Sequence, residues 1–134
     1  MTQPNTPRTE DSPLDDKLGG KVISLSPEQA VVRYPVAGNT QPYGLWHGGA
    51  SAVAVETAGS LAAMAAVGPA GQAVGQELSV SHLRPARAGH VTATATALRV
   101  GGHSAVYDVS VRGDDGEEIA HGRITVALRR PKAI

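Results

Sequence analysis

Residues 48–67, with the sequence GGASAVAVETAGSLAAMAAV, constrain the fold more than any other part of the chain. Alanine is the strongest helix former, so this stretch predicts one long helix that ends at the turn residues GPAG, 68–71. Glu56 is its only charged residue, and the helix therefore lacks the polar face of a surface helix. We expect it to be buried in a core or an interface, with another element packed closely against Gly59.

Segments that alternate between apolar and polar residues lie on both sides of this helix and predict strands. They are residues 21–26 and 29–36 before the helix, and 73–86, 89–100, 104–113 and 118–130 after it. Short turn sequences separate the last four segments, which predicts a meander. The chain is therefore expected to be an α+β protein with an antiparallel sheet around one central helix. A helix of small residues lets a curved sheet come close, so a core can form although the chain has no Phe.

The start of the chain is polar and rich in Pro, so we expect residues 1–12 to form a disordered tail and residues 13–134 a single domain. Ser12 and Pro13 predict a short helix that stops at Gly19. No apolar run reaches the roughly 18 residues that suggest a membrane span, and the start lacks the pattern of a signal peptide. The default expectation is a soluble cytoplasmic protein.

The charges balance: 12 basic and 12 acidic residues give a formal net charge of zero. This argues against a nucleic-acid-binding or membrane-binding protein. Residues 84–134 hold eight basic and five acidic residues, a net of +3 by subtraction. That excess suits a small polyanion, although charged strand ends facing solvent would give the same count. The chain has no Cys, which excludes disulfides and thiolate chemistry.

Glu56 and the two glycines at the helix start are the first candidates for chemistry. A carboxylate in this apolar helix either faces solvent or is placed for a function, since burial is costly without a partner and makes a carboxylate a better base. Gly48 and Gly49 either serve a tight chain path or leave backbone N–H groups free for an oxyanion. Glu56 lies eight residues beyond Gly48, or about 12 Å along the helix axis. We therefore expect Glu56 to act with Gly48 of a second subunit.

The neighbouring polar residues offer helpers. His47 can position a substrate group or simply begin the helix, Gln41 can present its amide, and Ser60 lies one turn after Glu56. The remaining histidines, His82, His90, His103 and His121, show no metal-binding spacing, so we expect no metal and no cofactor. A serine nucleophile is not indicated because the sequence has no GxSxG motif.

The segment QPYGLWHGGASAVAVETAGS, residues 41–60, resembles the motif of hotdog-fold acyl-CoA thioesterases, in particular the PaaI-type branch and the Glu-dependent 4-hydroxybenzoyl-CoA thioesterases. The similarity continues through the strands and covers roughly residues 18–130. The resemblance implies a hotdog fold, a homodimer with active sites at its interface, and pairing of dimers into a homotetramer. It implies hydrolysis of an acyl-CoA ester, with an aromatic acyl group expected.

By this resemblance Glu56 matches the catalytic carboxylate, acting as nucleophile or general base, and the Gly48 N–H polarises the thioester carbonyl. His47, Gln41 and Ser60 match the assisting residues. Residues expected near the substrate are Trp46, His82, Arg84, Gly101, Gly102, His103 and Ser104, the last five around the coenzyme A channel.

Two other functions remain open on the same fold. A non-catalytic acyl-CoA-binding or sensor protein would bind the ester without turnover. A dehydratase acting on 3-hydroxyacyl thioesters usually pairs His with a carboxylate in a different motif, which the sequence does not contain. The complete set of Gln41, His47, Gly48, Glu56 and Ser60 favours the hydrolase.

Overall fold

The computed structural model describes residues 12–131, and the expected tail therefore lies outside the described residues except for Ser12. The chain forms one antiparallel sheet of six described strands and two helices. In chain order the elements are α1 (Pro13–Lys17), β1 (Lys21–Leu25), β2 (Gln29–Pro35), α2 (Gly48–Val67), β3 (Gln72–His82), β4 (His90–Val100), β5 (Ser104–Gly113) and β6 (Glu118–Arg129).

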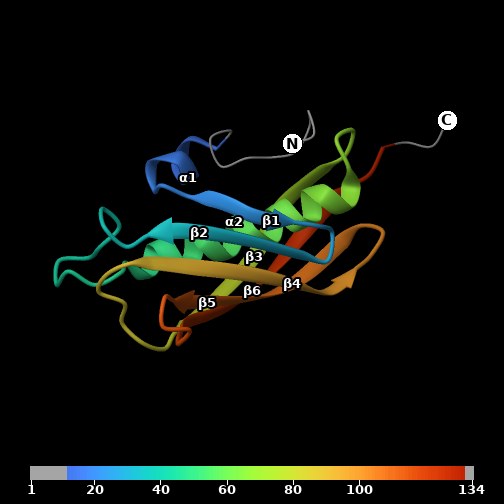
Figure 1. The fold of residues 1–134 in the computed structure, drawn as a ribbon. Coiled ribbons are helices and arrows are strands. Elements are labelled where there is room, and N and C mark those ends of the chain that lie inside the picture. Colours follow the sequence, from blue (N-terminus) through green and yellow to red (C-terminus); the bar gives the residue numbers. More distant parts are fainter. Residues whose placement is uncertain (1–11, 132–134) are drawn as a thin grey trace.

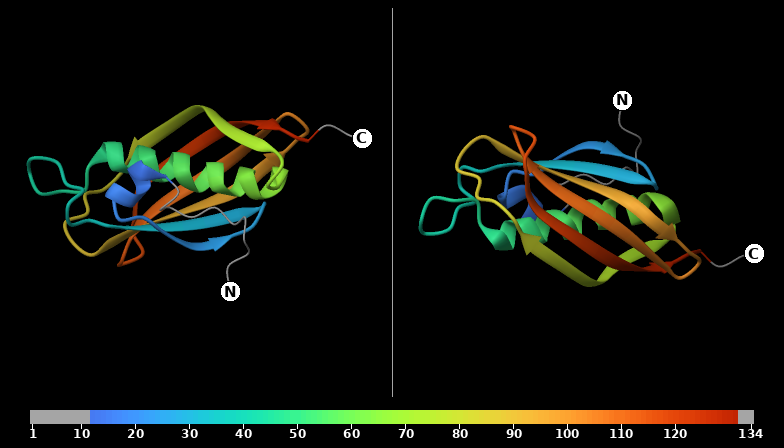
Figure 2. Two further views of the ribbon diagram at one scale, coloured as in Figure 1. Left: turned by 90° about the horizontal axis from the view of Figure 1, so that it is seen from above. Right: turned by 90° about the horizontal axis from the view of Figure 1, so that it is seen from below.

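The sheet curves around α2, which lies along its concave face (Figures 1 and 2). The expected architecture, an antiparallel sheet wrapped around one long central helix, is confirmed. The short helix expected after Ser12 is also confirmed: the Ser12 hydroxyl accepts the Asp15 N–H, and Pro13 occupies the first turn. α1 lies beside the first half of α2.

Small residues bring the helix and the sheet together. A side chain on Gly59 would overlap the Ile124 methyl group, which confirms the close approach expected there. Gly122 on β6 allows the same close approach from the side of the sheet, because a Cβ at that position would come within 2.8 Å of Val55 on α2. The largest fully buried side chains are Tyr34 and Tyr107. A core of Ala and Val around these two rings is therefore dense only because the backbones approach so closely.

The last four strands were expected to form a meander, and this expectation is wrong for the first of them, β3. The strand order is β1-β2-β4-β5-β6-β3, so β3 pairs with β6 at the edge of the sheet and not with β4. The strand also ends at His82, four residues before the expected end at Ala86. Residues 83–89 cross the end of the sheet, held by the Leu83 N–H to Ile119 O bond and by the Trp46 N–H to Ala86 O bond. Turn residues mark where a strand ends, but they do not specify which strand comes next to it.

α2 has 20 residues and is apolar enough, by length and composition, to cross a membrane, so the expectation that no run reaches that length is wrong. Its packing identifies it as the core helix of the fold: Ala54, Ala58 and Ala62 are fully buried against the sheet. The side that is only partly covered carries Glu56 and Ser60, both half-buried, and Met64, which is 38% exposed. In the single chain one stripe of the helix is thus not fully covered.

Candidate active site

The start of α2 is built by His47, whose extended backbone makes it the N-cap of the helix. Its Nδ1 accepts the Gly49 N–H at 2.8 Å, and its carbonyl accepts the Ala50 N–H at 2.9 Å. The neutral ring therefore carries its proton on Nε2, which can donate. The N–H of Gly48 has no hydrogen-bond partner within residues 12–131. Of the two glycine N–H groups expected to be free, only that of Gly48 is.

His82, at the end of β3, covers Gly48. A Cβ at Gly48 would lie 2.7 Å from His82 Cε1 and 2.9 Å from Nε2. Only glycine therefore fits at position 48 unless the His82 imidazole moves. The structure brings His82 to the helix start, and its expected place near the substrate stays a prediction.

Gln41 lies in the loop that leads into α2. Its side-chain oxygen accepts the Tyr43 N–H at 2.6 Å and the Leu45 N–H at 3.3 Å, and its own N–H donates to Leu45 O. These bonds close a tight loop before the helix and leave the NH₂ end of the amide as the group that can reach a ligand. His47 is tied to the same loop because its N–H donates to Asn39 O at 2.9 Å.

Glu56 lies half-buried in the middle of α2, on the side facing β3. Its carboxylate rests on Gly75, where any side chain would overlap Oε2. Strand β3 has a register irregularity here, between Gly75 and Glu77, and irregularities of this kind are frequent beside active sites. The carboxylate has no hydrogen-bond or ion-pair partner in the described part of the chain. The carboxylate is therefore held against β3 while its oxygens remain available to a ligand.

Glu56 and Gly48 do not meet within one chain. Eight helical residues separate them by about 12 Å, which is too far for both to contact one carbonyl group. Ser60 is half-buried one turn after Glu56, on the partly covered stripe of the helix. The single chain therefore holds two halves of a site: Gln41, His47, Gly48 and His82 at the helix start, and Glu56 with Ser60 at its middle.

Trp46 is a core residue. It is 7% exposed, its Nε1 donates to Ser51 Oγ at 2.7 Å, and its ring centroid lies 6.3 Å from that of Tyr34. Trp46 therefore fixes the loop before α2 to the core. Its expected part in substrate binding stays a prediction, and its burial gives that prediction no support.

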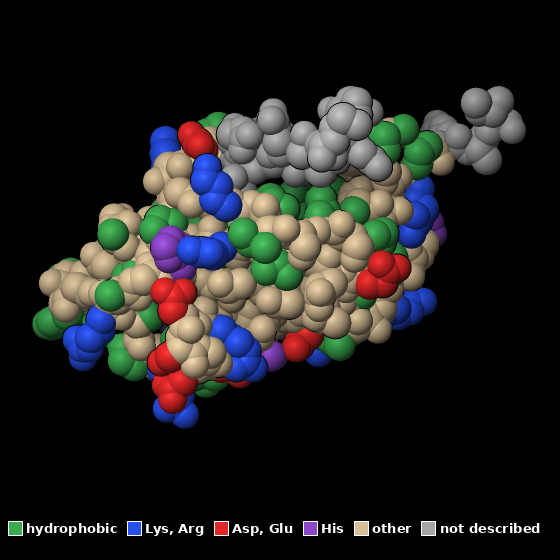
Figure 3. Space-filling model, viewed as in Figure 1, with side chains coloured by type: hydrophobic (Ala, Val, Ile, Leu, Met, Phe, Trp, Pro, Cys, Tyr) green, Lys and Arg blue, Asp and Glu red, His purple; other side chains and the backbone are tan. Residues whose placement is uncertain are grey.

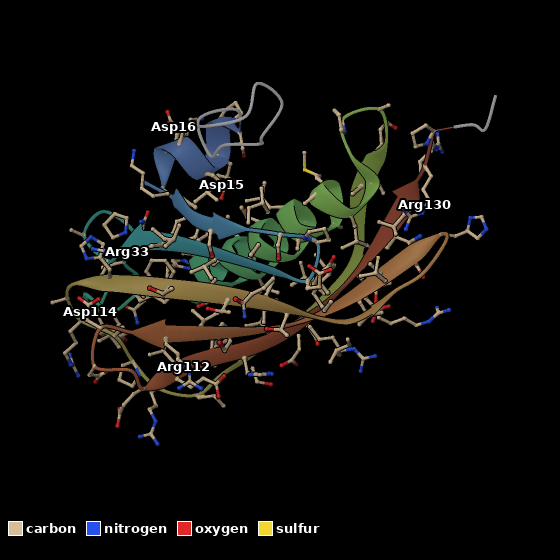
Figure 4. The ribbon with its side chains drawn as sticks, turned by 45° about the vertical axis from the view of Figure 1, so that its right-hand side comes forward. Asp15, Asp16, Arg33, Arg112, Asp114 and Arg130 are labelled. Atoms are coloured by element: carbon tan, nitrogen blue, oxygen red, sulfur yellow. The ribbon has the colours of Figure 1, made fainter. Side chains whose placement is uncertain are left out.

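The residues expected around the coenzyme A channel are divided between two ends of the molecule. Arg84 lies near the helix start and forms an exposed ion pair with Glu117 at 3.8 Å. Gly101, Gly102, His103 and Ser104 form the β4–β5 turn at the other end, beside the last turn of α2. Arg130 joins that turn to the helix by donating to Gly101 O, Gly102 O and Ala66 O (Figure 4). One chain does not bring Arg84 and this turn to the same pocket.

Sequence reasoning missed a buried polar cluster next to the site. Asp15 of α1 is 5% exposed and accepts O–H groups from Tyr34 at 2.6 Å and from Thr57 at 2.8 Å. Burial, followed by the bond to Asp15, raises the pKa of the Tyr34 phenol far above its ordinary value. The only signal in the sequence was an acidic pair, Asp15 and Asp16, and helical periodicity alone does not say which of them is buried.

His121 forms a separate polar cluster on the sheet face away from α2. Its two ring nitrogens bond to Glu118 at 2.6 Å and to Asp108 at 2.8 Å, and these carboxylates raise its pKa above the ordinary value. Both nitrogens thus already have hydrogen-bond partners. No group of three or more His, Asp or Glu side chains within residues 12–131 is arranged to hold a metal ion.

The six-stranded antiparallel sheet around one long helix is the hotdog fold, and comparison with known proteins places the chain within it. A thioesterase from Pseudomonas aeruginosa matches with a TM-score of 0.85 and 35% identity, covering 90% of this chain and 88% of that one. A thioesterase from Haemophilus influenzae matches with a TM-score of 0.84 and 29% identity, covering 89% and 84%.

Sequence relatives agree with the fold. A 1,4-dihydroxy-2-naphthoyl-CoA hydrolase from Listeria monocytogenes is 31% identical over 120 residues, which cover 89% of this chain and 98% of that protein. A proofreading thioesterase from Cronobacter turicensis is 32% identical over 116 residues, covering 86% and 85%. Residues 43–120 match the thioesterase superfamily. The chain belongs to that superfamily, whose members are thioester hydrolases.

Proposed function

We propose that the protein hydrolyses an acyl-CoA thioester with an aromatic acyl group, giving a free carboxylate and coenzyme A. The observation that carries the proposal is the pair of unpartnered polar groups on one helix, the Gly48 N–H and the Glu56 carboxylate. The aromatic acyl group is supported by the naphthoyl-CoA hydrolase among the relatives. Since coenzyme A esters are the substrates, we expect the protein to work in the cytoplasm.

The proposed enzyme is a homodimer in which each site takes Gly48 from one subunit and Glu56 from the other. Three features support this arrangement. The two groups are about 12 Å apart within a chain, the stripe of α2 with Glu56 and Ser60 is only partly covered, and β3 is an eleven-residue edge strand. Val74 on that edge is 63% exposed, and a long exposed edge is a surface that pairs readily with another strand. Pairing of dimers into a tetramer is part of the same proposal.

In the proposed mechanism the thioester oxygen accepts the Gly48 N–H, which stabilises the negative charge that develops during attack. His47 Nε2–H and the Gln41 NH₂ group are the further donors that hold this end of the substrate. Water adds to the carbonyl carbon, the carbon–sulfur bond breaks, and the sulfur leaves with a proton as the coenzyme A thiol. No metal ion or cofactor is needed for these steps.

Glu56 serves in one of two ways. As a general base it takes the proton from the attacking water, and as a nucleophile it forms an anhydride that water then opens. A single turnover in ¹⁸O-labelled water tests for an anhydride opened at the Glu56 carbonyl, because that route leaves label in the Glu56 carboxylate. The general-base route places the label in the product acid alone.

The test is the Glu56→Gln variant assayed with benzoyl-CoA by release of free thiol. We expect turnover to fall by roughly 10²–10⁴-fold, the usual contribution of a general base, and further if Glu56 is the nucleophile. The matched control is Glu28→Gln, which changes an exposed carboxylate between β1 and β2 and leaves turnover unaltered. Wild-type protein that binds benzoyl-CoA but releases no thiol would instead support the sensor protein considered above.

A further inference from the structure

A buried hydrogen bond spans the start of α2. Trp46 lies immediately before the N-cap His47, and its Nε1 donates to Ser51 Oγ at 2.7 Å. Both ends of this bond are buried, since Trp46 is 7% exposed and Ser51 is 1% exposed. Removing either side chain would leave the other with a polar group that has no partner inside the protein, which is costly.

The bond joins two positions at which the chain entering a helix is commonly fastened. The residue before the N-cap and the fourth residue of the helix often pack together through apolar side chains, and this contact fixes the angle at which the chain enters. Trp46 and Ser51 hold these two positions, because α2 begins at Gly48. A hydrogen bond here takes the place of the apolar contact, and it defines a direction as well as a distance.

The groups proposed to contact the thioester lie between the two ends of this bond. His47 and Gly48 directly follow Trp46, and the peptide group between them carries the Gly48 N–H. Because that peptide group is planar, the direction of the N–H depends on ψ of His47, which is 130°. A change in the entry angle would rotate the peptide group and turn the N–H away from the carbonyl oxygen.

Trp46 is itself fixed from the other side. Its backbone N–H donates to Ala86 O at 2.8 Å, in the segment that follows His82 at the end of β3. Its ring packs against Tyr34 of β2, with the ring centroids 6.3 Å apart. The indole N–H therefore holds the first turn of α2 in place relative to β2 and to the segment after β3.

We propose that Trp46, through its hydrogen bond to Ser51, is a positioning residue that sets the direction of the Gly48 N–H for catalysis. The inference rests on the proposed function, because it assumes that the thioester oxygen accepts this N–H. Trp46 acts without touching the substrate, which agrees with its burial. Productive geometry requires groups to be placed within about 0.5 Å, so a small rotation of the first turn is enough to slow the reaction.

The test removes the bond in three ways. Ser51→Ala removes the acceptor, Trp46→Phe removes the donor, and the double variant removes both. With benzoyl-CoA we expect each variant to lower kcat by roughly tenfold and to leave KM unchanged, because the contact with the oxygen strengthens in the transition state. The double variant is expected to lose no more kcat than either single variant, since the two side chains act as one unit.

Tyr107→Phe is the matched control. It removes another hydrogen bond of a buried side chain, from the Tyr107 hydroxyl to Pro27 O, also at 2.7 Å. Neither residue belongs to the start of α2. We expect this variant to unfold at a lower urea concentration, as Ser51→Ala does, and to keep the wild-type kcat. A purely structural role of Trp46 predicts instead that every folded variant keeps the wild-type kcat.

Hydrogen exchange measured by NMR reports the positioning without turnover. Trp46 is the only tryptophan of the chain, so its indole N–H gives one resonance, and we expect it to exchange faster in Ser51→Ala. The Gly49 N–H, which donates to His47 Nδ1, reports the geometry of the first turn. We expect its exchange to be about tenfold faster in Ser51→Ala than in Tyr107→Phe, since a local opening of the helix start no longer has to break the buried bond.

The outcomes separate the inference from the proposed function. If wild-type protein hydrolyses no acyl-CoA, the proposed function is wrong, while Gly49 exchange that depends on Ser51 still supports Trp46 as the residue that positions the first turn. If wild-type protein hydrolyses benzoyl-CoA, then wild-type kcat in folded Ser51→Ala and Trp46→Phe proteins would overturn the inference alone. An equal loss of kcat in Tyr107→Phe, or Gly49 exchange as slow in Ser51→Ala as in the wild type, would overturn it as well.

Discussion

At residue scale, Gly48 meets two requirements that no other residue meets together. It leaves room for the His82 ring, whose Cε1 would lie 2.7 Å from a Cβ, and its N–H remains free at the start of the helix. Gly75 has a comparable role at the other half of the site, because only a residue without a side chain leaves space for the Glu56 carboxylate. Each half of the site thus depends on a glycine, Gly48 on α2 and Gly75 on β3.

The N–H of Gly48 can be removed without breaking the helix. Proline is accepted at the first helical position, and His47 before it has φ −73° and ψ 130°, which suits a residue that precedes proline. We expect Gly48→Pro to lower kcat by roughly 10²–10³-fold, the loss typical of one oxyanion donor. Gly48→Ala is the matched control, since it places the same Cβ against His82 but keeps the N–H. Equal kcat values for the two variants would show that the N–H has no part in the reaction.

At the scale of elements, α1 is attached to the core by polar contacts as much as by apolar ones. Asp15 joins it to β2 through Tyr34 and to α2 through Thr57, and Asn39 binds its last carbonyl. Charged groups on the surface contribute less: Figure 3 shows Lys, Arg, Asp and Glu side chains scattered over this face, with several of both signs near the β5–β6 turn. The ion pair of Arg84 with Glu117 is exposed on both sides and is worth little.

The attachment of α1 predicts how stability depends on alkaline pH. Burial and the bond to Asp15 raise the pKa of Tyr34 above 10.0, the ordinary value that it regains on unfolding. Its contribution to stability is therefore complete below pH 10 and is lost as the pH rises from 10 toward the folded pKa, because only the unfolded phenol releases its proton. Tyr34→Phe is expected to unfold at lower urea concentration at pH 7 and to lose less further stability between pH 10 and 11.5.

Urea unfolding followed by circular dichroism at several pH values provides the measurement. Tyr43→Phe is the control, because Tyr43 is 85% exposed and its loss should leave the pH profile as in the wild type. Tyr107, whose pKa is also raised by burial, contributes equally to all three proteins. Identical slopes for wild type and Tyr34→Phe above pH 10 would contradict the role given to Tyr34.

At the scale of the whole molecule, the sequence predicted what depends on local pattern. The helix of residues 48–67, the Ser12 cap and the close contact at Gly59 follow from residue size and spacing, and all three are confirmed. The position of β3 beside β6 was missed because it depends on a long-range pairing that turn residues do not encode. The burial of Asp15 was missed for the same reason, since its partner Tyr34 is 19 residues away in sequence and Thr57 is 42.

The candidate site was only partly predictable. The free Gly48 N–H and the half-buried Glu56 fit the chemistry expected of their residue types. The second glycine N–H, at Gly49, is instead bonded to His47, a local competition that spacing does not show. The separation of Arg84 from the turn of residues 101–104 shows that a list of binding residues from one sequence can belong to different parts of one surface or to two subunits.

The division of the site between subunits leads to a mixing experiment. A Gly48→Pro protein and a Glu56→Gln protein are each inactive when pure. In a mixed dimer, one site carries both changes and the other carries none, so a 1:1 mixture after subunit exchange regains about a quarter of wild-type activity by random pairing of two-fold dimers. Exchange is driven by mild urea and followed by native mass spectrometry, and a mixture kept unexchanged is the control. If mixed dimers form but recover no activity, Gly48 and Glu56 do not share a site across the interface, and the catalytic groups must be sought within one chain.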